Sequence, residues 1–509
     1  MRDQGIGSWL RKRRIKSPSA TMIRFERHDT SYAEFADRTL RLANGLRARG
    51  VERSDRVAYL GDNHPSFLES MFACALIGAI FVPLNTRLAA GELAFALDDS
   101  GSTLLVYSQQ LATVALAASA QAELSALIVV EGADHVDANN FENVIAAADP
   151  LTDETDVSLD DPALILYTSG TTGKPKGAVL THGNLTWNSF DVMVDYDVTS
   201  SERALMVSPL FHVASLGMGT LPVILKGATV VLERRFDAQR VLELIESERI
   251  TWLSGVPTTF QMLCESPGWA TADLSSLRSL TCGGSPVPLR VIEAYESRGL
   301  SFTGGYGMTE AAPGVTSLAP GASRDKAGTS GQPHFFVDVR IANPDATGVG
   351  EIEVRGPNVI RQYWNRPDAS AAAFDEPGWF KSGDLGYVDS DGYLTISDRL
   401  KDMVISGGEN IYPAEVELVI VELTDVTGVA VIGARDAKWG EVPVAIITVR
   451  DGATVTEADI RAHLDGRLAR YKIPKRVFIA DELPRTASGK VLKSRLREQY
   501  AAQLNDGNR

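Results

Sequence analysis

Short apolar runs typical of buried strands alternate with helical patterns along the first half of this chain. Such alternation predicts α/β layers whose sheets are largely parallel. At 509 residues the chain is too long for a single hydrophobic core, so several subdomains are expected. The apolar runs lie at 56–60, 104–107, 126–130, 205–207, 229–232 and 252–253, and helical patterns lie at 38–49 and 238–249.

The pattern changes near residue 331 to short β runs separated by turns. Runs at 337–341, 350–354 and 393–397 carry this pattern, and a smaller β-α-β unit with a terminal helix follows Asp398. The boundary falls in the charged segment 398–402, which has little to bury. We therefore predict a large N-terminal domain and a small C-terminal one with a core of its own.

Composition excludes some classes of function. The net charge of −15 argues against general nucleic-acid binding, because such proteins need a basic footprint. Apolar content of 44% and charged content of 23% are ordinary for a soluble globular protein. The three cysteines form no CxxC pair, so neither a zinc site nor a disulfide framework is indicated, and a cytoplasmic location is expected.

The N-terminal region is basic at 11–16 but lacks the apolar stretch of a signal peptide. This cluster fits a solvated helix end; a weak peripheral contact with the inner membrane face is the alternative. The longest apolar run, 71–82, is too short to span a bilayer and is stopped by Pro83. We interpret it as a buried helix leading into a strand.

Residues 167–177 combine hydroxyls, glycines and lysines directly after the apolar run 164–166. Glycines let backbone N–H groups approach an anion, and hydroxyls and lysines add donors and positive charge. This is the chemistry of a polyphosphate-binding loop. It is not a P-loop, because Gly170 is followed five residues later by Pro175 rather than by a Gly-Lys-Ser/Thr ending. An ordinary turn between strands is the alternative.

Two further glycine-rich segments carry polar side chains. Residues 304–310 place Tyr306 and Glu310 among glycines, where a ring can pack on a base and a carboxylate can hold Mg²⁺. Residues 378–386 place Asp384 between glycines, and a carboxylate can accept the hydroxyls of a ribose. Taken singly, each segment also fits a plain turn.

Three segments lie in the last quarter of the chain. A strand at 393–397 ends in charged residues, a glycine turn at 406–409 opens a helix, and a polar loop at 484–490 ends in Lys490. Alone, each fits a solvated strand end, a helix-entry loop or a surface lysine.

Together, and in this order, the six segments resemble the adenylate-forming enzymes, which include acyl-CoA synthetases, aryl-CoA ligases, beetle luciferases and peptide-synthetase adenylation domains. The resemblance covers essentially the whole chain. Segments 209–217 and 363–367 are most similar to those of bacterial long-chain fatty-acyl-CoA synthetases. The family implies an N-terminal domain (1–398) of two α/β subdomains plus a β-barrel-like subdomain, a hinge (399–402) and a small mobile α+β C-terminal domain (403–509).

The resemblance also implies residue roles. Glu310 would hold Mg²⁺, and the catalytic residues would be Lys490, Glu310, Thr309 and His212. The ATP-binding residues would be Thr168, Ser169, Gly170, Thr171, Thr172, Gly173, Lys174, Lys176, Gly305, Tyr306, Gly307, Asp384 and Arg399. The acyl pocket would involve His212, Val213, Gly217, Thr258, Gly283 and Gly284. A hinge at Lys401 would bring a CoA channel made of Ser406, Gly407, Gly408 and Glu409 to the site.

The implied reaction joins a carboxylic acid to CoA in two steps, using ATP and Mg²⁺ and releasing AMP and pyrophosphate. A fatty acid is the expected substrate, with an aryl acid, or a carrier protein loaded in trans, as alternatives. A catalytically silent binder would show a broken motif, and none of the six segments is broken. A homodimer is left open.

Overall fold

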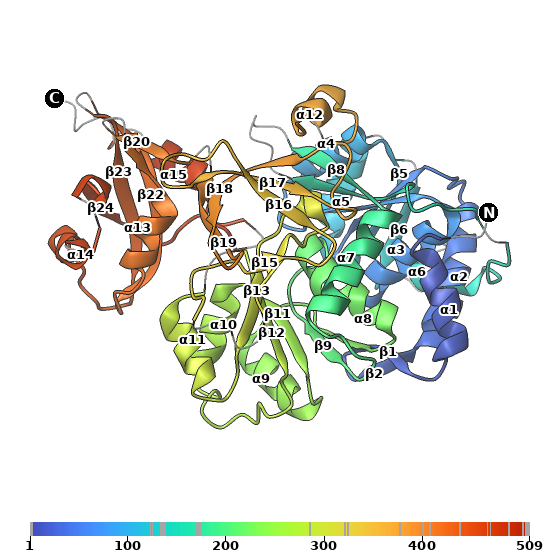
Figure 1. Ribbon diagram of the computed structural model, residues 1–509. Coiled ribbons are helices and arrows are strands. Elements are labelled where there is room, and N and C mark those ends of the chain that lie inside the picture. The colour runs from blue at the N-terminus through green and yellow to red at the C-terminus, as the bar shows by residue number, and fades with distance from the viewer. Residues whose placement is uncertain are drawn as a thin grey trace.

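The computed structural model of the protein describes residues 4–503 except 123, 125, 133–138, 154, 169–174, 285–286, 320–321, 323–324, 376–377, 400–401, 407–408, 437–438, 466, 469, 487–488 and 501–502. Figure 1 shows the N-terminal helices at one side of the molecule and the C-terminal elements at the other.

The first sheet has six strands in the order β6-β5-β3-β4-β7-β8. All neighbours are parallel except β7 and β8, which form an antiparallel pair. The predicted strands at 56–60 and 126–130 are confirmed as β3 and β6. The strands are β3 (Arg56–Leu60), β4 (Ile80–Pro83), β5 (Ser102–Ser108), β6 (Ala126–Val130), β7 (Pro162–Thr168) and β8 (Lys176–Thr181). The helices of this part are α3 (Pro65–Ile77), α4 (Ala90–Ser100), η1 (Gln109–Leu111), α5 (Ala112–Gln121) and α6 (Phe141–Ala146).

The second sheet has seven strands in the order β13-β12-β11-β9-β10-β1-β2, and only the edge pair β1–β2 is antiparallel. Its strands are β1 (Thr21–Phe25), β2 (His28–Ser31), β9 (Arg203–Met206), β10 (Thr229–Leu232), β11 (Trp252–Gly255), β12 (Ser279–Gly283) and β13 (Phe302–Gly305). The accompanying helices are α1 (Gly7–Lys16), α2 (Tyr32–Arg47), α7 (His182–Asp195), the π-helical η2 (Ser215–Thr220), α8 (Leu221–Lys226), α9 (Ala238–Ser247), α10 (Pro257–Cys264) and α11 (Leu289–Glu296). The two largely parallel sheets confirm the α/β prediction.

A four-stranded antiparallel sheet, in the order β16-β17-β18-β19, follows the second sheet along the chain. It occupies the region where the sequence changes to short β runs. Its strands are β16 (Asp338–Ala342), β17 (Gly350–Arg355), β18 (Phe380–Val388) and β19 (Leu394–Arg399); β14 (Thr316–Ser317), β15 (Gln332–Pro333), η3 (Thr309–Ala311) and α12 (Pro367–Ala372) lie in the same part of the chain.

The residues from Val404 onward build a separate sheet with two hydrophobic clusters of their own. A small α+β C-terminal unit is thereby confirmed, whereas its motion stays a prediction. Its strands are β20 (Val404–Ser406), β21 (Glu409–Ile411), β22 (Val426–Asp436), β23 (Gly440–Val449) and β24 (Arg476–Ile479). Its helices are α13 (Pro413–Ile420), α14 (Glu457–Leu464), η4 (Arg470–Lys472) and α15 (Lys493–Gln499).

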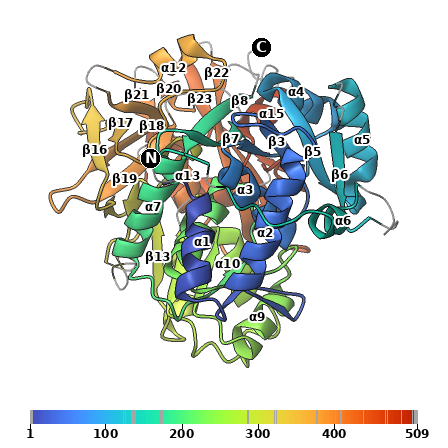
Figure 2. The same cartoon turned by 90° about the vertical axis from the view of Figure 1, so that its right-hand side faces the viewer.

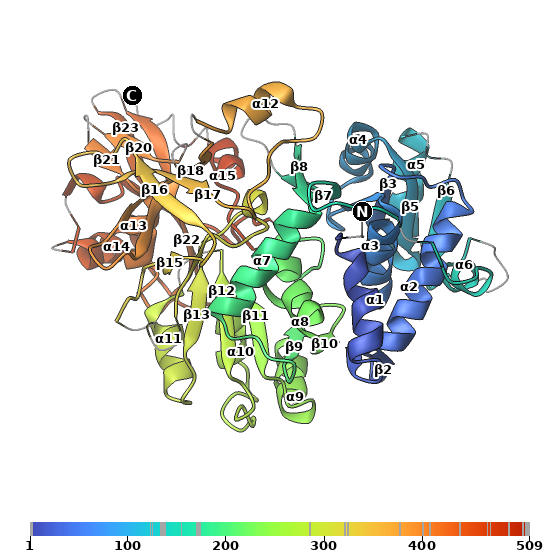
Figure 3. The same cartoon turned by 45° about the vertical axis from the view of Figure 1, so that its right-hand side comes forward.

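Polar contacts hold this C-terminal unit against the rest of the protein. The Arg290 Nη1 on α11 donates to the Val421 carbonyl oxygen at 3.2 Å, and Arg450 pairs with Glu265 at 3.8 Å. The Asp398 carboxylate accepts the Ala414 N–H at 2.8 Å, which satisfies a donor in the first turn of α13. Figure 3 shows α7 in the middle of the molecule, between the C-terminal elements and helices α1–α3.

The N-terminal helices illustrate why local sequence sets the element bounds. Helix α2 begins at Tyr32 rather than at 38, because Ser31 and Glu34 form a capping box. Helices α1, α2 and α3 pack on one another, and Figure 2 shows α1 and α2 facing outward. Helix α3 is buried along almost its whole length and leads into β4, which confirms the reading of run 71–82. In the described part of the chain, no helix has the length and apolarity to cross a membrane.

Three members of the basic cluster 11–16 have structural partners. The Arg13 Nε donates to the Leu225 carbonyl oxygen at 2.9 Å, near the end of α8, and Arg11 donates to the Asp153 carbonyl oxygen at 3.0 Å. Lys12 donates to Ser8 at 3.1 Å. The cluster therefore ties α1 to its surroundings, and a membrane contact stays a prediction.

Candidate active site

The glycine-rich segment after β13 folds back on itself too closely for side chains. A Cβ on Gly305 would collide with the Thr316 carbonyl oxygen, and one on Gly307 with the Pro313 carbonyl oxygen. Between them, the Tyr306 N–H donates to the Thr316 hydroxyl at 3.0 Å. The close approach of the two backbone segments therefore requires glycine at both positions. It also fixes the backbone from which the Tyr306 and Glu310 side chains extend.

Tyr306 and Asp384 meet although 78 residues separate them. The Tyr306 hydroxyl donates to Asp384 Oδ2 at 2.5 Å, and Asp384 is buried on β18. In the β18–β19 ladder Asp384 lies opposite Arg399. The aromatic residue and both residues predicted to hold a ribose thus lie in one neighbourhood.

Glu310 has a partner that sequence reasoning did not assign to the site. The Tyr363 hydroxyl donates to Glu310 Oε1 at 3.0 Å, and the ammonium of Lys176 lies 5.5 Å from the centre of the Tyr363 ring. Burial and the nearby Glu310 carboxylate raise the pKa of Tyr363, so it remains a hydrogen-bond donor. Tyr363 stands in the segment 363–367, which was noted only for its resemblance.

The base of the hydroxyl-rich loop is the end of the β7–β8 hairpin, where Thr168 pairs with Lys176. The predicted ATP-binding residues Ser169, Gly170, Thr171, Thr172, Gly173 and Lys174 lie outside the described residues. Asp99, at the end of α4, holds this base from behind: its carboxylate accepts the Tyr167 hydroxyl at 2.8 Å and the Arg366 guanidinium at 2.5 Å. These contacts hold the paired ends of β7 and β8 in place.

Lys490 reaches the N-terminal domain from the C-terminal one. Its Cε lies 3.9 Å from the position of a Cβ on Gly284. A Cβ placed on the adjacent Gly489 would lie 3.7 Å from Val256 Cγ2 and 3.9 Å from Thr258 Oγ1. The Lys490 N–H donates to the Thr486 hydroxyl at 3.1 Å, so a turn presents the lysine. The amine near the chain's tail thus lies beside the predicted acyl-pocket residues Gly284 and Thr258.

His212 lies near Lys490, close enough for the charge of the lysine to act on its ring. Burial, with the positive charges of Arg87 and Lys490, lowers the pKa of His212 to about 4, so its ring is neutral at physiological pH. Its Nε2 is buried and has no hydrogen-bond partner in the described part of the protein. Arg87, which sequence reasoning did not single out, is exposed near the histidine.

The π-helical η2 begins at Ser215, shortly after His212. Asn188 connects η2 to the glycine-rich segment that carries Tyr306 and Glu310. Its side-chain amide donates to the Gly217 carbonyl oxygen at 2.8 Å and accepts the Gly314 N–H at 2.9 Å. Val213 precedes η2 and Gly217 lies within it, and both are buried; Gly283 lies at the end of β12 near the Gly305 carbonyl. After the roles predicted for Tyr306 and His212, we call Tyr306, Glu310 and Asp384 the nucleotide end, and His212, Gly219 of η2 and Ser254 of β11 the acyl end.

The predicted CoA-channel residues lie elsewhere in the C-terminal unit. Ser406 is buried, pairing with Glu409 across the β20–β21 hairpin and with Gly440 of β23. Gly407, Gly408 and the predicted hinge residue Lys401 lie outside the described residues. Their roles stay predictions.

The residues present fit a magnesium nucleotide. Within the described ranges, no group of three or more His, Cys, Asp or Glu side chains could hold a metal ion. A lone carboxylate such as Glu310 suits Mg²⁺, which takes one or two carboxylates and completes its shell with phosphate oxygens and water.

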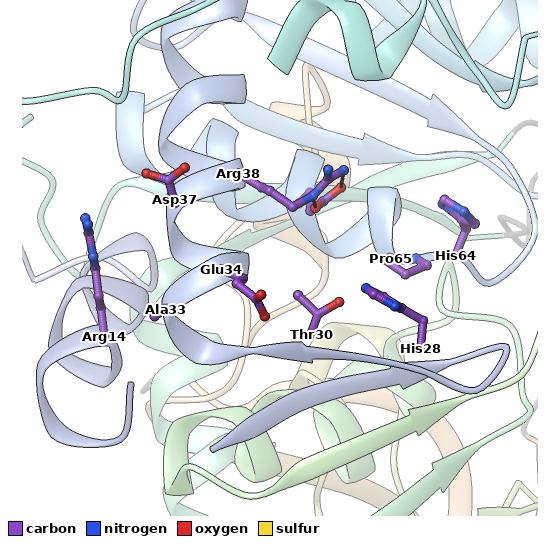
Figure 4. Close-up of a pocket in the computed structure, with 10 residues that line it drawn as sticks. Arg14, His28, Thr30, Ala33, Glu34, Asp37, Arg38, His64 and Pro65 are labelled. Atoms are coloured by element: carbon purple, nitrogen blue, oxygen red, sulfur yellow. Dashed lines mark hydrogen bonds and ion pairs between the residues drawn. The ribbon is translucent and has the colours of Figure 1, made fainter. Parts of the chain in front are cut away.

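A groove is formed by α1, β2, α2 and α3, and its most enclosed charges are paired with each other. Figure 4 shows Arg38 inside it, and its guanidinium is neutralised by Glu69 at 2.5 Å and Glu142 at 2.8 Å. His64 caps α3 by accepting the Ser66 N–H at 3.2 Å. The lining residues are Arg14, His28, Thr30, Ala33, Glu34, Asp37, Arg38, His64, Pro65 and Glu69.

Comparison with known proteins agrees with this geometry. Residues 10–364 match the family model described as AMP-binding enzyme, and residues 415–490 match the AMP-binding enzyme C-terminal domain. The chain is 50% identical to a feruloyl-CoA synthase of Amycolatopsis, over 98% of this chain and 100% of that protein. It is 39% identical to the long-chain-fatty-acid–CoA ligase FadD13 of Mycobacterium tuberculosis, over 98% and 99%.

A solved structure of the o-succinylbenzoate-CoA synthetase of Bacillus subtilis, in complex with its acyl-adenylate intermediate, superimposes with a TM-score of 0.86 at 34% identity, covering 98% of this chain and 99% of that one. The chain therefore belongs to the AMP-binding enzyme family, the adenylate-forming enzymes, and within it to the ATP-dependent, AMP-forming acid–CoA ligases.

Proposed function

We propose that this ligase activates an aryl-substituted carboxylic acid, in particular a hydroxycinnamate of the ferulate class, and transfers it to CoA. The structural observation that carries the proposal is the filled sheet face at the acyl end. Trp252 is 1% exposed, its ring lies 6.1 Å from that of Tyr196, and its Nε1 donates to Thr281 at 2.8 Å. Two large rings would close the floor of the acid pocket there, which favours a short, flat acid over a long alkyl chain.

The identity values support the same choice. The feruloyl-CoA synthase shares 50% of aligned residues with this chain, whereas the fatty-acid ligase FadD13 shares 39%. The expectation of a fatty-acid substrate rested on segments 209–217 and 363–367. A long-chain acid is retained as the second candidate because of the 39% identity to FadD13.

The first half-reaction brings two anions together, the acid carboxylate and the triphosphate of ATP, so charge neutralisation and orientation are the main demands on the protein. One acid oxygen attacks the α-phosphorus of ATP, the bond to pyrophosphate breaks, and an acyl-adenylate forms. Lys490 would bridge the acid carboxylate and the α-phosphate, with Thr309 and Lys176 on the phosphates. Mg²⁺ held by Glu310 would offset phosphate charge. Tyr306 would pack on adenine, and Asp384 with Arg399 would hold the ribose.

In the second half-reaction the thiol of CoA attacks the acyl carbon and AMP leaves. Lys490 occupies the mouth of the acyl end, so it would have to withdraw before a thiol could enter. A rotation at Lys401 would remove it and bring the Ser406–Glu409 hairpin to the site.

A turnover screen tests the substrate class. We expect kcat/KM for ferulate and p-coumarate with CoA to exceed that for octanoate and palmitate by at least tenfold. Measuring both pyrophosphate release and acyl-CoA formation separates adenylation from thioester formation. Preference for palmitate would favour the fatty-acid candidate, and acyl transfer to a phosphopantetheinyl protein in preference to CoA would favour a carrier-loading enzyme.

A further inference from the structure

The Ser254 hydroxyl on β11 is buried, and no hydrogen-bond partner for it is found among the described residues. The other hydroxyls on this part of the sheet are satisfied. Thr281 accepts from Trp252 Nε1, and Thr303 donates to the Leu280 carbonyl oxygen at 3.1 Å. Because buried polar groups in folded proteins are nearly always paired, one unpaired hydroxyl beside paired ones calls for a specific explanation.

The position of Ser254 relative to Lys490 indicates what could pair with it. The next residue on the same strand face is Val256, whose side chain lies 3.7 Å from the Cβ positions constructed on Gly284 and Gly489. Those glycines flank the place where Lys490 enters. Ser254 therefore lies about 6.6 Å further along the strand, on the side away from the lysine.

The opposite wall comes close to this hydroxyl at a glycine. Gly219 of η2 faces Ser254, and a Cβ placed on Gly219 would lie 3.2 Å from Ser254 Oγ and 2.5 Å from the Met206 methyl group. A side chain at 219 would thus press on Met206 and occupy the approach to the serine. Glycine at 219 therefore lets η2 lie beside Met206 and Ser254 without a collision.

We infer that Ser254 is a specificity-determining residue, which hydrogen-bonds the polar group on the ring of an aryl acid, at the edge remote from its carboxylate. A serine hydroxyl both donates and accepts, so it can pair with a phenolic hydroxyl in either direction. The inference rests on the proposed function, since it requires an aryl acid whose carboxylate points to Lys490. An alkyl chain would leave the hydroxyl unpaired.

Two acids that differ only in this group provide the test. p-Coumarate carries a para hydroxyl and cinnamate lacks it. We expect the wild-type enzyme to prefer p-coumarate by about tenfold in kcat/KM, and Ser254→Ala to bring the ratio close to one, mainly by lowering the value for p-coumarate. An unchanged ratio in Ser254→Ala would overturn the inference.

Ser70→Ala is the matched control. Ser70 is another buried serine whose hydroxyl has no partner in the described part of the chain, but it lies on α3 in the hydrophobic core. It should leave the ratio between the two acids unchanged. The Tm of ligand-free Ser254→Ala should equal or exceed that of the wild type, because the variant removes an unpaired buried hydroxyl. A cooperative melt therefore shows that a lost preference is not a folding defect.

The outcomes separate the inference from the proposed function. Turnover of both aryl acids with no change in preference in Ser254→Ala contradicts the inference alone. Failure to turn over any aryl acid, with turnover of palmitate, contradicts both. A second variant, Gly219→Ala, should lower kcat/KM for p-coumarate more than for benzoate, which is shorter; equal losses for the two acids would contradict the placement of the ring beside Ser254.

Discussion

The two ends of the site treat their polar groups differently. At the nucleotide end, Tyr306 and Asp384 bond each other and Glu310 accepts from Tyr363. At the acyl end, His212 Nε2 and Ser254 Oγ are buried without partners in the described part of the protein. The nucleotide end is organised before a ligand binds, as expected for a ligand that does not vary. In the proposed function the acid pairs with these groups, so specificity among acids would depend on them.

Lys490 is predicted to serve both ends, so its removal should have the largest effect. We expect Lys490→Ala to slow adenylation by 10²- to 10³-fold, because a charge aimed at the reacting carboxylate and phosphate is lost. Pyrophosphate exchange measures this step. Conversion of preformed acyl-adenylate to acyl-CoA should be spared.

Lys472→Ala provides the control for that variant, since Lys472 pairs with Glu415 at 2.7 Å within the C-terminal unit. Its adenylation rate should match that of the wild type. Normal adenylation by Lys490→Ala would remove the lysine from the mechanism and leave the two ends unconnected.

The hydrogen bond at Glu310 comes next. Tyr363→Phe removes the donor to Glu310, and we expect kcat to fall about 10- to 100-fold, because groups that orient a metal-holding carboxylate contribute on this scale. The Mg²⁺ concentration for half-maximal rate should rise, while the KM for the acid stays unchanged. Tyr387→Phe, at a residue that is 39% exposed, should behave as the wild type. A changed acid KM would show that the ends are less independent than the contacts suggest.

The Tyr306–Asp384 pair should show a smaller effect, limited to the nucleotide. Tyr306→Phe keeps the ring but removes the hydrogen bond to the carboxylate, so the KM for ATP should rise about tenfold. Its preference between p-coumarate and cinnamate should equal that of the wild type. If that preference shifts, the pair also shapes the acyl end.

Titration of His212 is the mildest test. Its folded pKa of about 4 lies below the unfolded value of about 6.5, so the unfolded chain binds the proton first. The stability contribution is therefore present above about pH 6.5 and is lost as the pH falls towards 4. The NMR signal that disappears in His212→Asn should titrate near pH 4, and that variant should lose less Tm between pH 7 and 5. A titration midpoint near pH 6.5 would mean that water reaches the His212 ring and that the acyl end is not desolvated.

The sequence predicted residues of the nucleotide end in more detail than those of the acyl end, for a physical reason. Holding a polyphosphate and a metal demands glycines, hydroxyls and carboxylates at fixed spacings, and such spacings are visible in a sequence. Ser254 is one serine in an apolar strand, and only the fold shows that it is buried and unpaired. Tyr363 stands in a segment that the sequence analysis noted. Its contact with Glu310 joins residues 53 positions apart, and only the fold brings them together.

The fold shows the same division. Apolar runs predicted individual strands, because a strand's burial is a local property of its sequence. Strand order was not predictable in this way: β1 pairs with β10, roughly two hundred residues later, as Ile23 opposite Val230. Such pairings depend on how distant surfaces fit together, which a single sequence does not display.

Asn188 gives the architecture a consequence for the order of substrate binding. One buried amide spans the Gly217 carbonyl and the Gly314 N–H, so a shift of the π-helical turn is felt in the backbone beside Tyr306. Occupancy by an acid that moves η2 would therefore alter the grip on ATP, and thermodynamic reciprocity requires ATP to alter the grip on that acid by the same factor. A poorly fitting acid would then bind weakly itself and would also fail to raise the affinity of the enzyme for ATP.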